Sequence, residues 1–417
     1  MPKLYIEGKH QLNGEIEVQG AKNSVLPLLA ATFLCSGISV IKNCPWLLDV
    51  ESSLKILTHL GCECKFEDNT VTVNATNAKN CDIPEELMRE MRSSVMFLGA
   101  ILGRMKRAVI SSPGGCELGP RPIDLHISAL KKLGANVKED HGFLEFDSGD
   151  GLKGCEITLG FPSVGATENI ILSAATASGT TVIRNAAREP EISDLADFLN
   201  SAGARIYGCG SDTVIIHGVK ALNGVTHTVI PDRIAAATYM AAAAVTEGEL
   251  TLKNVMPSHF VSISSVFENM GCKIEPIGKS LKIWAPKKLK RVPTVRTLVY
   301  PGFPTDAGPV LMAALSVAKG TSVFVENIFE NRYRYTDELN RLGAKIKTEA
   351  KVAVIEGVDN LSAAKCHCTD LRGGAALVVA ALAASGTTEI DKIEHIKRGY
   401  ENISENLRRL GAVAYEE

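Results

Sequence analysis

The sequence predicts an α/β fold of two domains, each built from three repeats of a unit about 70 residues long. Three observations predict it: a helix-ending phrase that recurs six times, an alanine-rich helix before each copy, and a direct match between the two halves of the chain. The chain of 417 residues is also long for one hydrophobic core, which independently favours two domains.

The recurring phrase reads apolar-x-x-apolar-Gly-small, as in Leu130-Lys131-Lys132-Leu133-Gly134-Ala135. Glycine adopts the left-handed conformation that ends many helices, so each copy predicts a helix end. Successive glycines are separated by 68 to 73 residues, a regularity that indicates duplication. The six glycines are Gly61, Gly134, Gly203, Gly271, Gly343 and Gly411.

An alanine-rich helix precedes each phrase and is also expected to end at a glycine. Short β-branched runs such as Thr180-Thr181-Val182-Ile183 follow these helices and predict strands. Each unit is therefore predicted as helix, strand, helix and two strands. The glycines expected to end these first helices are Gly37, Gly103, Gly179, Gly248, Gly320 and Gly386.

The two halves match directly, because Gly8-x-x-x-Leu12-Asn13-Gly14 recurs 210 residues later as Gly218-x-x-x-Leu222-Asn223-Gly224. We expect a hairpin over residues 4–18 to complete the last repeat, whose chain ends near Tyr415. One domain then spans 22–228 and the other 1–21 plus 229–417. In each, the helices are expected to pack together inside a wall of sheets, and the two crossings of the chain would act as a hinge.

Composition argues against several classes of protein. The net charge of −2 provides no general attraction to nucleic acid or anionic membrane. No apolar run reaches the ~18 residues of a membrane span, and the first residues lack the apolar core of a signal peptide. Eleven cysteines without such a signal favour free thiols in the cytoplasm.

Two Cys-x-Cys pairs, Cys62/Cys64 and Cys366/Cys368, raise the question of a metal site. Zinc sites combine such pairs with a second ligand pair at close range, and the sequence has none. Alternation of this kind also suits a strand, where residues i and i+2 share a face. We expect no metal.

The second repeat is longer than the others, and its extra residues fall within 111–122, a run rich in glycine and proline that contains Cys116. An incidental thiol in a surface loop is one interpretation. The other is a reactive thiol, because Arg121 lies five residues further on and a nearby cation lowers a thiol's pKa.

Cations at helix starts are the second departure from the repeat. They face the positive end of the helix dipole, which is unfavourable unless an anion binds there too. Asp306, at the equivalent place in the fifth repeat, is either a helix cap or a base. Each cation alone suits a solvated surface, but together they indicate a ligand with several negative charges. The cations are Lys22, Arg92 and Arg372 at helix starts, with Arg332 and Arg398 in loops before helices.

Together with the repeats, several short motifs resemble the UDP-N-acetylglucosamine 1-carboxyvinyltransferase family, from Leu4 to the C-terminus. The motifs are Gly20-Ala21-Lys22-Asn23, Pro113-Gly114-Gly115-Cys116, Arg121-Pro122-Ile123-Asp124-Leu125-His126, Gly165-Ala166-Thr167-Glu168-Asn169, Ala187-Arg188-Glu189-Pro190-Glu191 and Phe329-Glu330-Asn331-Arg332.

The resemblance implies two inside-out α/β barrels with the substrate cleft between them. It implies that phosphoenolpyruvate binds to Lys22, Asn23, Arg121, Arg332, Arg372 and Arg398. It implies that UDP-N-acetylglucosamine binds to Arg92, Arg121, Pro122, Ile123, Asp124, Leu125, Ser163, Val164, Gly165, Asp306 and Ile328.

The implied reaction forms the first committed precursor of peptidoglycan and needs no cofactor. Phosphoenolpyruvate reacts at C2 once C3 is protonated, so the site needs an acid over C3, a base at the sugar 3′-hydroxyl and cations around the phosphate. Cys116 is expected as the acid, Asp306 as the base and Lys22 as a catalytic cation. The resemblance also implies that fosfomycin targets Cys116.

Two alternatives remain from the sequence. The shikimate-pathway enolpyruvyl transferase has the same repeats and donor, but it relies on no loop cysteine. A six-repeat ring such as a DNA sliding clamp belongs to a different class and would need basic residues in all repeats.

Overall fold

The computed structural model describes residues 2–111 and 123–417, apart from the side chain of Arg92. It divides into two compact units, which we describe separately: the C-terminal unit of residues 2–19 and 231–417, and the N-terminal unit of described residues between 20 and 230. Each has its own buried core, and the two cores share no residue. Among the described residues, no helix is long and apolar enough to cross a membrane.

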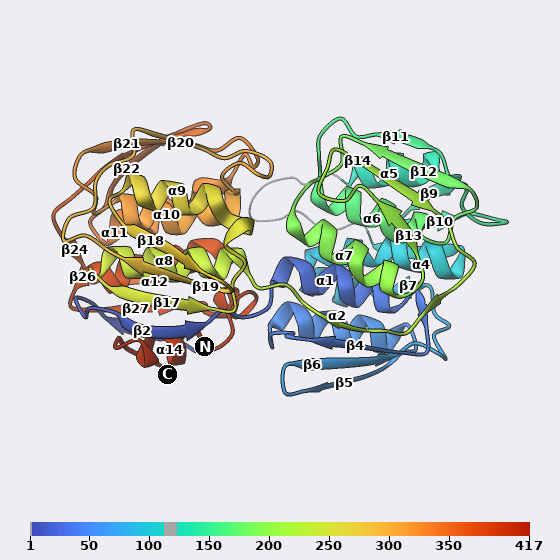
Figure 1. Cartoon of the computed structure of the whole chain (residues 1–417), viewed down its shortest axis with the longest axis horizontal. Helices are drawn as coiled ribbons and strands as arrows, with labels where there is room; N and C mark the ends of the chain where they lie inside the picture. The colour runs from blue at the N-terminus through green and yellow to red at the C-terminus, as the bar shows by residue number, and fades with distance from the viewer. Residues whose placement is uncertain (1, 112–122) are drawn as a thin grey trace. The chain divides into compact units, whose positions relative to one another are not determined.

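The C-terminal unit surrounds three buried helices with sheets (Figure 1). Its described helices are α8 (Arg233–Val245), η2 (Pro257–Phe260), α9 (Val261–Asn269), η3 (Thr305–Ala307), α10 (Gly308–Leu315), η4 (Arg332–Tyr335), α11 (Thr336–Arg341), α12 (Leu371–Ala383), α13 (Glu394–Lys397) and α14 (Ile403–Arg409). Helices α8, α10 and α12 pack against one another. Alanine makes this close approach possible because its side chain is small, and α8 has seven alanines in 13 residues.

Three four-stranded sheets in this unit have the orders β18-β19-β17-β2, β20-β21-β23-β22 and β25-β27-β1-β28, and β24 pairs with β26. The strands are β1 (Leu4–Glu7), β2 (Asn13–Glu17), β17 (Glu249–Lys253), β18 (Lys273–Ile277), β19 (Ser280–Trp284), β20 (Thr294–Arg296), β21 (Thr321–Val325), β22 (Lys345–Glu349), β23 (Val352–Glu356), β24 (Leu361–Ser362), β25 (Lys365–His367), β26 (Ala384–Ser385), β27 (Thr387–Asp391) and β28 (Val413–Glu416).

The N-terminal unit repeats this plan around α1, α4 and α6. Its described helices are α1 (Lys22–Thr32), α2 (Leu48–His59), α3 (Glu85–Glu90), η1 (Arg92–Met96), α4 (Phe97–Met105), α5 (Asp124–Lys132), α6 (Val164–Ala174) and α7 (Pro190–Ser201). Nine of the 11 residues of α6 are buried, whereas α5 buries one face against the core.

The sheets of the N-terminal unit have the orders β16-β4-β6-β5, β7-β8-β10-β9 and β11-β12-β14-β13, and β15 pairs with β3. The strands are β3 (Cys35–Ser36), β4 (Ile38–Lys42), β5 (Glu63–Glu67), β6 (Thr70–Asn74), β7 (Asp82–Ile83), β8 (Arg107–Ser111), β9 (Asn136–Asp140), β10 (Phe143–Asp147), β11 (Glu156–Thr158), β12 (Thr180–Arg184), β13 (Arg205–Tyr207), β14 (Thr213–His217), β15 (Leu222–Asn223) and β16 (Thr226–Thr228).

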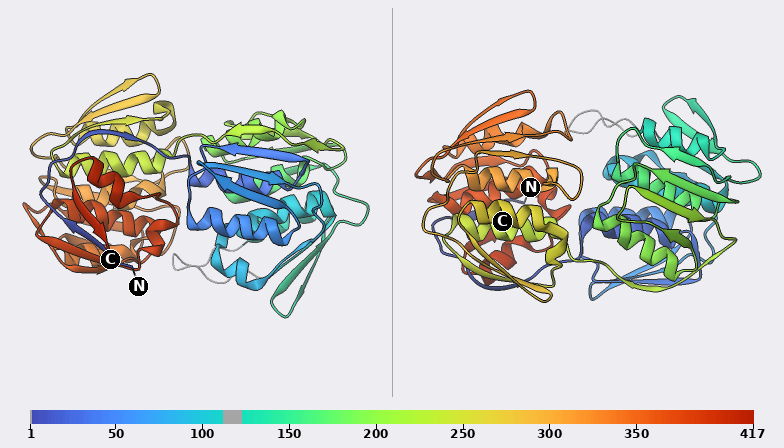
Figure 2. Two further views of the ribbon diagram at one scale, coloured as in Figure 1. Left: turned by 90° about the horizontal axis from the view of Figure 1, so that it is seen from below. Right: turned by 45° about the horizontal axis from the view of Figure 1, so that its top comes forward.

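The expected N-terminal hairpin is wrong. Strand β1 pairs with the final strand β28, with Tyr5 opposite Tyr415, which confirms that the N-terminus completes the last sheet. Strand β2 instead pairs in parallel with β17 in a different sheet. The blue N-terminal segment therefore crosses two sheets of the C-terminal unit (Figure 2, left). The backbone between the two strands does not form a hairpin turn. It makes hydrogen bonds to other parts of the unit instead: Lys9 N donates to Leu382 O, and Leu12 O accepts from Glu249 N.

All six phrase-ending glycines have φ between +94° and +107°, which confirms the predicted helix ends. The prediction for the first helices is wrong, because these helices do not end at the predicted glycines. Helices α1, α6, α10 and α12 end earlier, at Thr32, Ala174, Leu315 and Ala383, ahead of Gly37, Gly179, Gly320 and Gly386. At the other two glycines another residue takes the left-handed position. Gly103 lies inside α4, and Lys106 takes the left-handed position that ends this helix. Glu247 (φ +55°), rather than Gly248, does so after α8. Both glycines are instead needed for close packing: a Cβ on Gly248 would lie 2.4 Å from the carbonyl oxygen of Leu12.

Candidate active site

Three residues predicted for the site meet in the C-terminal unit around the carboxylate of Asp306. Arg332 Nη2 lies 3.0 Å from Asp306 Oδ1, and Arg372 Nη2 lies 3.1 Å from Asp306 Oδ2. The two arginine side chains are 3% and 4% exposed, whereas that of Asp306 is 26% exposed. One partly exposed carboxylate is therefore bound by two buried guanidinium groups.

The surroundings of the two arginines bear on what the cluster can bind. Burial alone would lower the pKa of Arg372, but the Asp306 carboxylate raises it, so Arg372 stays charged. Arg332 Nε is buried and has no hydrogen-bond partner among the described residues. An unpaired donor on a buried cation is costly unless a ligand satisfies it. The arrangement is suited to an anion.

The elements around Asp306 explain its position. Asp306 lies inside η3 and is not its N-cap residue. The N-cap residue is Pro304, and no side chain caps this turn. The simple cap interpretation is therefore wrong for Asp306. Arg372 is the second residue of α12, whose amides at Arg372 and Gly373 donate to Asp370 Oδ1 at 3.0 Å. A local cap thus fixes the backbone that carries this arginine.

Tyr400 is a contact of Arg372 that sequence reasoning missed. Arg372 Nη1 lies 3.4 Å from the Tyr400 hydroxyl, which shares a 2.8 Å hydrogen bond with Thr238 Oγ1. The guanidinium also stacks over the tyrosine ring, 5.7 Å from its centroid. Nothing in the sequence marks Tyr400 apart from its place two residues after Arg398, which is partly buried after α13.

In the N-terminal unit, Lys22 is the first residue of α1, and its Nζ lies 2.9 Å from Asp49 Oδ2. Asp49 lies in the first turn of α2, where a carboxylate is favourable, and its side chain is 2% exposed. It offsets the unfavourable position of Lys22 at the positive end of α1. Sequence reasoning missed Asp49, which looks like an ordinary first-turn acid. Asn23 follows Lys22 and is partly buried.

The structure also brings together two of the predicted acceptor-binding segments. Asp124 and Leu125 begin α5, after Ile123, while Ser163 caps α6, which begins at Val164. The two helix starts touch, because a Cβ on Gly165 would lie 3.2 Å from Cε1 of His126. Glycine at this position permits the contact.

His126 and Asn169 hold these helix starts in place. Asn169 Nδ2 lies 2.7 Å from His126 Nδ1 and 3.1 Å from Val95 O, while its Oδ1 accepts from Gly99 N at 2.6 Å. Burial lowers the pKa of His126 to about 4, so the ring is neutral at pH 7 and accepts this hydrogen bond. Both residues belong to motifs visible in the sequence, but their contact joins positions 43 residues apart.

Ile328, the remaining acceptor-binding candidate of the C-terminal unit, lies in the turn after β21. Its amide donates to Glu326 Oε1 at 2.7 Å. Cys116, Arg121, Pro122 and the side chain of Arg92 lie outside the described residues.

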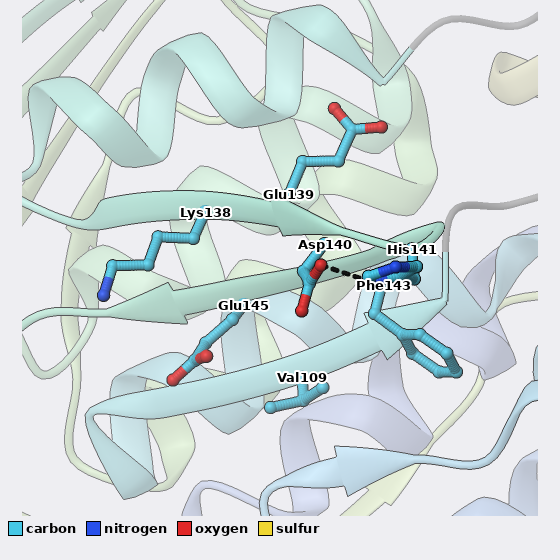
Figure 3. A pocket seen from close by; sticks show the side chains of 7 residues that line it. All are labelled: Val109, Lys138, Glu139, Asp140, His141, Phe143 and Glu145. Carbon is cyan, nitrogen blue, oxygen red and sulfur yellow. Dashed lines mark hydrogen bonds and ion pairs between the residues drawn. The ribbon is translucent and has the colours of Figure 1, made fainter.

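An open hollow of about 690 Å³ lies on strands β8, β9 and β10 (Figure 3). Most of its lining side chains are exposed, and they carry both signs of charge, including Lys138 and Glu145. None of the candidate residues lines it. Within residues 2–111 and 123–417, no group of three or more His, Cys, Asp or Glu residues could hold a metal ion.

Comparison with known proteins assigns the fold. The family model of EPSP synthase (3-phosphoshikimate 1-carboxyvinyltransferase) matches residues 6–407. The crystal structure of the enolpyruvyl transferase NikO from Streptomyces tendae has a TM-score of 0.90 at 24% identity, over 100% of this chain and 99% of that one. EPSP synthase from Acinetobacter baumannii has a TM-score of 0.76 at 19% identity, over 100% of both chains. The chain therefore has the α/β fold of the enolpyruvyl transferases.

Curated relatives assign the family more narrowly. UDP-N-acetylglucosamine 1-carboxyvinyltransferase 2 of Caldanaerobacter subterraneus subsp. tengcongensis is 52% identical over 412 residues, 99% of each chain. UDP-N-acetylglucosamine 1-carboxyvinyltransferase 1 of Symbiobacterium thermophilum is 48% identical over 98% of this chain and 94% of its own length. On this similarity over nearly the whole length, the chain belongs to the UDP-N-acetylglucosamine 1-carboxyvinyltransferase family of enzymes.

Proposed function

We propose that this enzyme transfers the enolpyruvyl group of phosphoenolpyruvate to the 3′-hydroxyl of UDP-N-acetylglucosamine and releases phosphate. This is the first committed step of peptidoglycan precursor synthesis, and we expect it to take place in the cytoplasm. The observation that carries the proposal is the carboxylate of Asp306 bound by Arg332 and Arg372. It combines a carboxylate that could act as a base with two buried guanidinium groups, as this reaction requires.

Cys116 and Asp306 have complementary roles in the proposed mechanism. Cys116 gives a proton to C3 of the donor, which makes C2 electrophilic, and Asp306 takes the proton of the 3′-hydroxyl as its oxygen attacks C2. A tetrahedral ketal results. Loss of phosphate from C2 and of a proton from C3 then restores the double bond, now in the enol ether. The thiol of Cys116 is also able to form a covalent adduct with the donor.

The remaining candidates divide between the two substrates. The donor site consists of Lys22, Asn23, Arg121, Arg332, Arg372 and Arg398. The acceptor site consists of Arg92, Arg121, Pro122, Ile123, Asp124, Leu125, Ser163, Val164, Gly165, Asp306 and Ile328. The contact between the starts of α5 and α6 supports the acceptor site, because it joins two of these segments. Helix N-termini are favourable places for the diphosphate of a sugar nucleotide.

For the fold, we propose two inside-out α/β barrels of three repeats each, spanning 22–228 and 1–21 plus 229–417. Three four-stranded sheets in each described unit support this architecture, as do the three mutually packed helices of the C-terminal unit. The boundaries between the units, after Gln19 and after Ile230, support the proposed domain limits.

The test is phosphate release from phosphoenolpyruvate with UDP-N-acetylglucosamine, with shikimate 3-phosphate, and with no acceptor. We expect release only with the sugar nucleotide. The second acceptor is included because the matching family model is that of EPSP synthase. Release with shikimate 3-phosphate alone would overturn the proposal in favour of that activity.

A further inference from the structure

A buried carboxylate that has no role so far lies beside the candidate base. Glu326 follows β21, and its side chain is 1% exposed. No ion pair joins it to a lysine or arginine of the described chain, yet both of its oxygens accept hydrogen bonds. An isolated buried charge is costly, so its donors must compensate for the lost water.

One oxygen of Glu326 contacts the turn that carries Asp306. Thr305 Oγ1 donates to Glu326 Oε2 at 2.8 Å. The carbonyl oxygen of the same threonine accepts from Arg332 Nη2 at 3.2 Å. Thr305 is therefore held from its side chain and from its backbone, and Asp306 is the next residue along η3.

The other oxygen holds the turn that carries Ile328. Glu326 Oε1 accepts from Ile328 N at 2.7 Å and from Phe329 N at 3.2 Å. It also accepts from Thr297 Oγ1 at 2.9 Å, and that hydroxyl accepts from Asn327 N at 2.8 Å. The turn from 327 to 329 is thus fixed by its backbone amides.

We propose that Glu326 is a positioning residue that holds the base Asp306 and the acceptor-lining residue Ile328 at a fixed separation. The inference rests on the proposed function of these two residues. Glu326 is not among the residues proposed to contact either substrate. Its effect comes through geometry, because a shift of about 1 Å in a base can cost up to a hundredfold in rate.

Two variants separate the two arms of this network, which are the hydrogen bond of Oε2 with Thr305 and the hydrogen bonds of Oε1 with the turn 327–329. Thr305→Val removes only the hydroxyl that donates to Oε2 and keeps the carbonyl contact with Arg332. We expect kcat to fall about tenfold or more, with KM for UDP-N-acetylglucosamine changed less than about twofold. Glu326→Gln removes the negative charge that strengthens the hydrogen bonds of both oxygens, and its amide oxygen can accept at only one of the two ends. It should lower kcat and also raise KM for the sugar nucleotide.

Matched variants control for folding. Thr305→Ser restores the hydroxyl and should recover most of the activity lost in Thr305→Val. Thr388→Val is the control for removing a buried hydroxyl, since Thr388 in β27 is 0% exposed and its hydroxyl has no hydrogen-bond partner in the described chain. It should leave kcat and KM unchanged.

Steady-state phosphate release and thermal unfolding are measured for all five proteins, including the wild type. A wild type inactive with UDP-N-acetylglucosamine refutes the proposed function itself. With an active wild type, a normal kcat for Thr305→Val refutes the positioning role, even if its unfolding temperature falls. If Thr305→Val does not fold, Glu326→Gln decides: unchanged kcat and KM in that variant refute the inference.

Discussion

Two helix starts share the phrase Gly-Phe-Pro-Ser/Thr but are used differently. In the N-terminal unit, Ser163 caps α6 directly, accepting from Ala166 N at 3.3 Å. In the C-terminal unit, the corresponding Thr305 donates to Glu326 instead, and a 3₁₀ turn precedes α10. The next residue is Val164 in one unit and Asp306 in the other. A duplicated helix start is a simple cap in one place, whereas its copy presents a carboxylate to two arginines.

Candidate cations differ in the same way. Lys22 in the N-terminal unit pairs with the buried Asp49, whose Oδ2 lies 2.9 Å from its Nζ. In the C-terminal unit Arg332 and Arg372 both bind the carboxylate of Asp306, and Asp232 also raises the pKa of Arg372. The Lys22–Asp49 pair stabilises its own fold, whereas the buried Nε of Arg332 has no partner in the described chain and could donate to an anion.

The largest effect is expected for Asp306→Asn, which keeps the shape of the side chain but removes the base and the charge shared by two arginines. Activity should fall by a thousandfold or more, within the range of general-base catalysis. The free energy of unfolding should fall by about 3 kcal/mol, because two buried guanidinium groups lose their charged partner. This value is at the low end of the range for breaking a buried ion pair, since the Asp306 side chain is 26% exposed. Phosphate release and chemical unfolding measure the two effects.

Asp359→Asn provides the control for Asp306→Asn, since that side chain is 94% exposed beside Lys288. It should change neither activity nor stability. Turnover near the wild-type rate in Asp306→Asn would show that another group removes the proton, and the contrast between the two helix starts would then concern structure alone.

Cys116 is expected to be the one thiol that fosfomycin alkylates rapidly. Burial raises the pKa of the Cys64 thiol to about 11. It raises the pKa of five other thiols to about 12. All six sulfurs therefore stay protonated at neutral pH and react slowly. The five other thiols are those of Cys35, Cys62, Cys209, Cys272 and Cys366. Mass spectrometry after brief treatment should locate one adduct, formed faster when UDP-N-acetylglucosamine is present.

Variants at Cys116 test its role in turnover. Cys116→Ser should lose the label and most turnover, because a hydroxyl is a much poorer acid near neutral pH. Cys116→Asp should keep activity by supplying another proton donor, and it should resist the epoxide. An adduct on any other cysteine, or normal turnover by the serine variant, contradicts the assigned acid.

Lys22→Ala should cost roughly 3 kcal/mol of transition-state stabilisation, or about a hundredfold in rate. From the sequence alone, its stability is expected to hold, because a cation leaves the positive end of α1. The pair with Asp49 reverses that expectation: a buried carboxylate loses its partner, and stability should fall by about 2–3 kcal/mol. Adding Asp49→Asn should recover stability but not activity. A single variant as stable as the wild type would contradict the contrast between the two units.

Local signals in the sequence were sufficient for the repeated elements. The six phrase-ending glycines are predictable because their backbone conformation excludes most other residues. Gly103 and Gly248 were wrongly predicted to end helices. Glycine is also required where the backbone packs closely against other atoms, and the sequence does not distinguish this requirement from a left-handed conformation. The separation of β1 from β2 depended on pairing with strands more than 200 residues away, which no local signal encodes.

The arrangement of the candidate site was partly predictable in the same sense. Their charges at helix starts marked Lys22, Arg372 and Asp306 as candidates. The sequence did not indicate that Arg372 and Asp306, which are 66 residues apart in the chain, contact each other. The groups that hold them were missed, because a tyrosine, a first-turn aspartate and a glutamate after a strand are common in stable proteins. Their roles depend on burial and contacts, which only the folded chain supplies. The missed groups are Asp49, Glu326 and Tyr400.

The smallest effect concerns a second difference between the same two helix starts. Glu168 in α6 corresponds to Val310 in α10, five residues after Ser163 and Thr305 respectively, and both side chains are 1% exposed. Burial, with Glu191 and Glu189 nearby, raises the pKa of Glu168 well above 4.5. Its Oε1 has no hydrogen-bond partner in the described chain.

Glu168→Gln should therefore stabilise the protein at pH 8. A carboxyl whose pKa is raised by folding favours the folded state while protonated, and this contribution is lost as pH rises from about 4.5 through the raised value. The neutral amide escapes that loss. We expect a gain on the order of 1 kcal/mol, or about 2–4 °C in unfolding temperature, at pH 8 and none at pH 4.5. Glu86→Gln, at an exposed position on α3, should show no such pH-dependent gain. A variant less stable than the wild type at pH 8 would show that the Glu168 carboxylate, unlike Val310, is held charged by its surroundings.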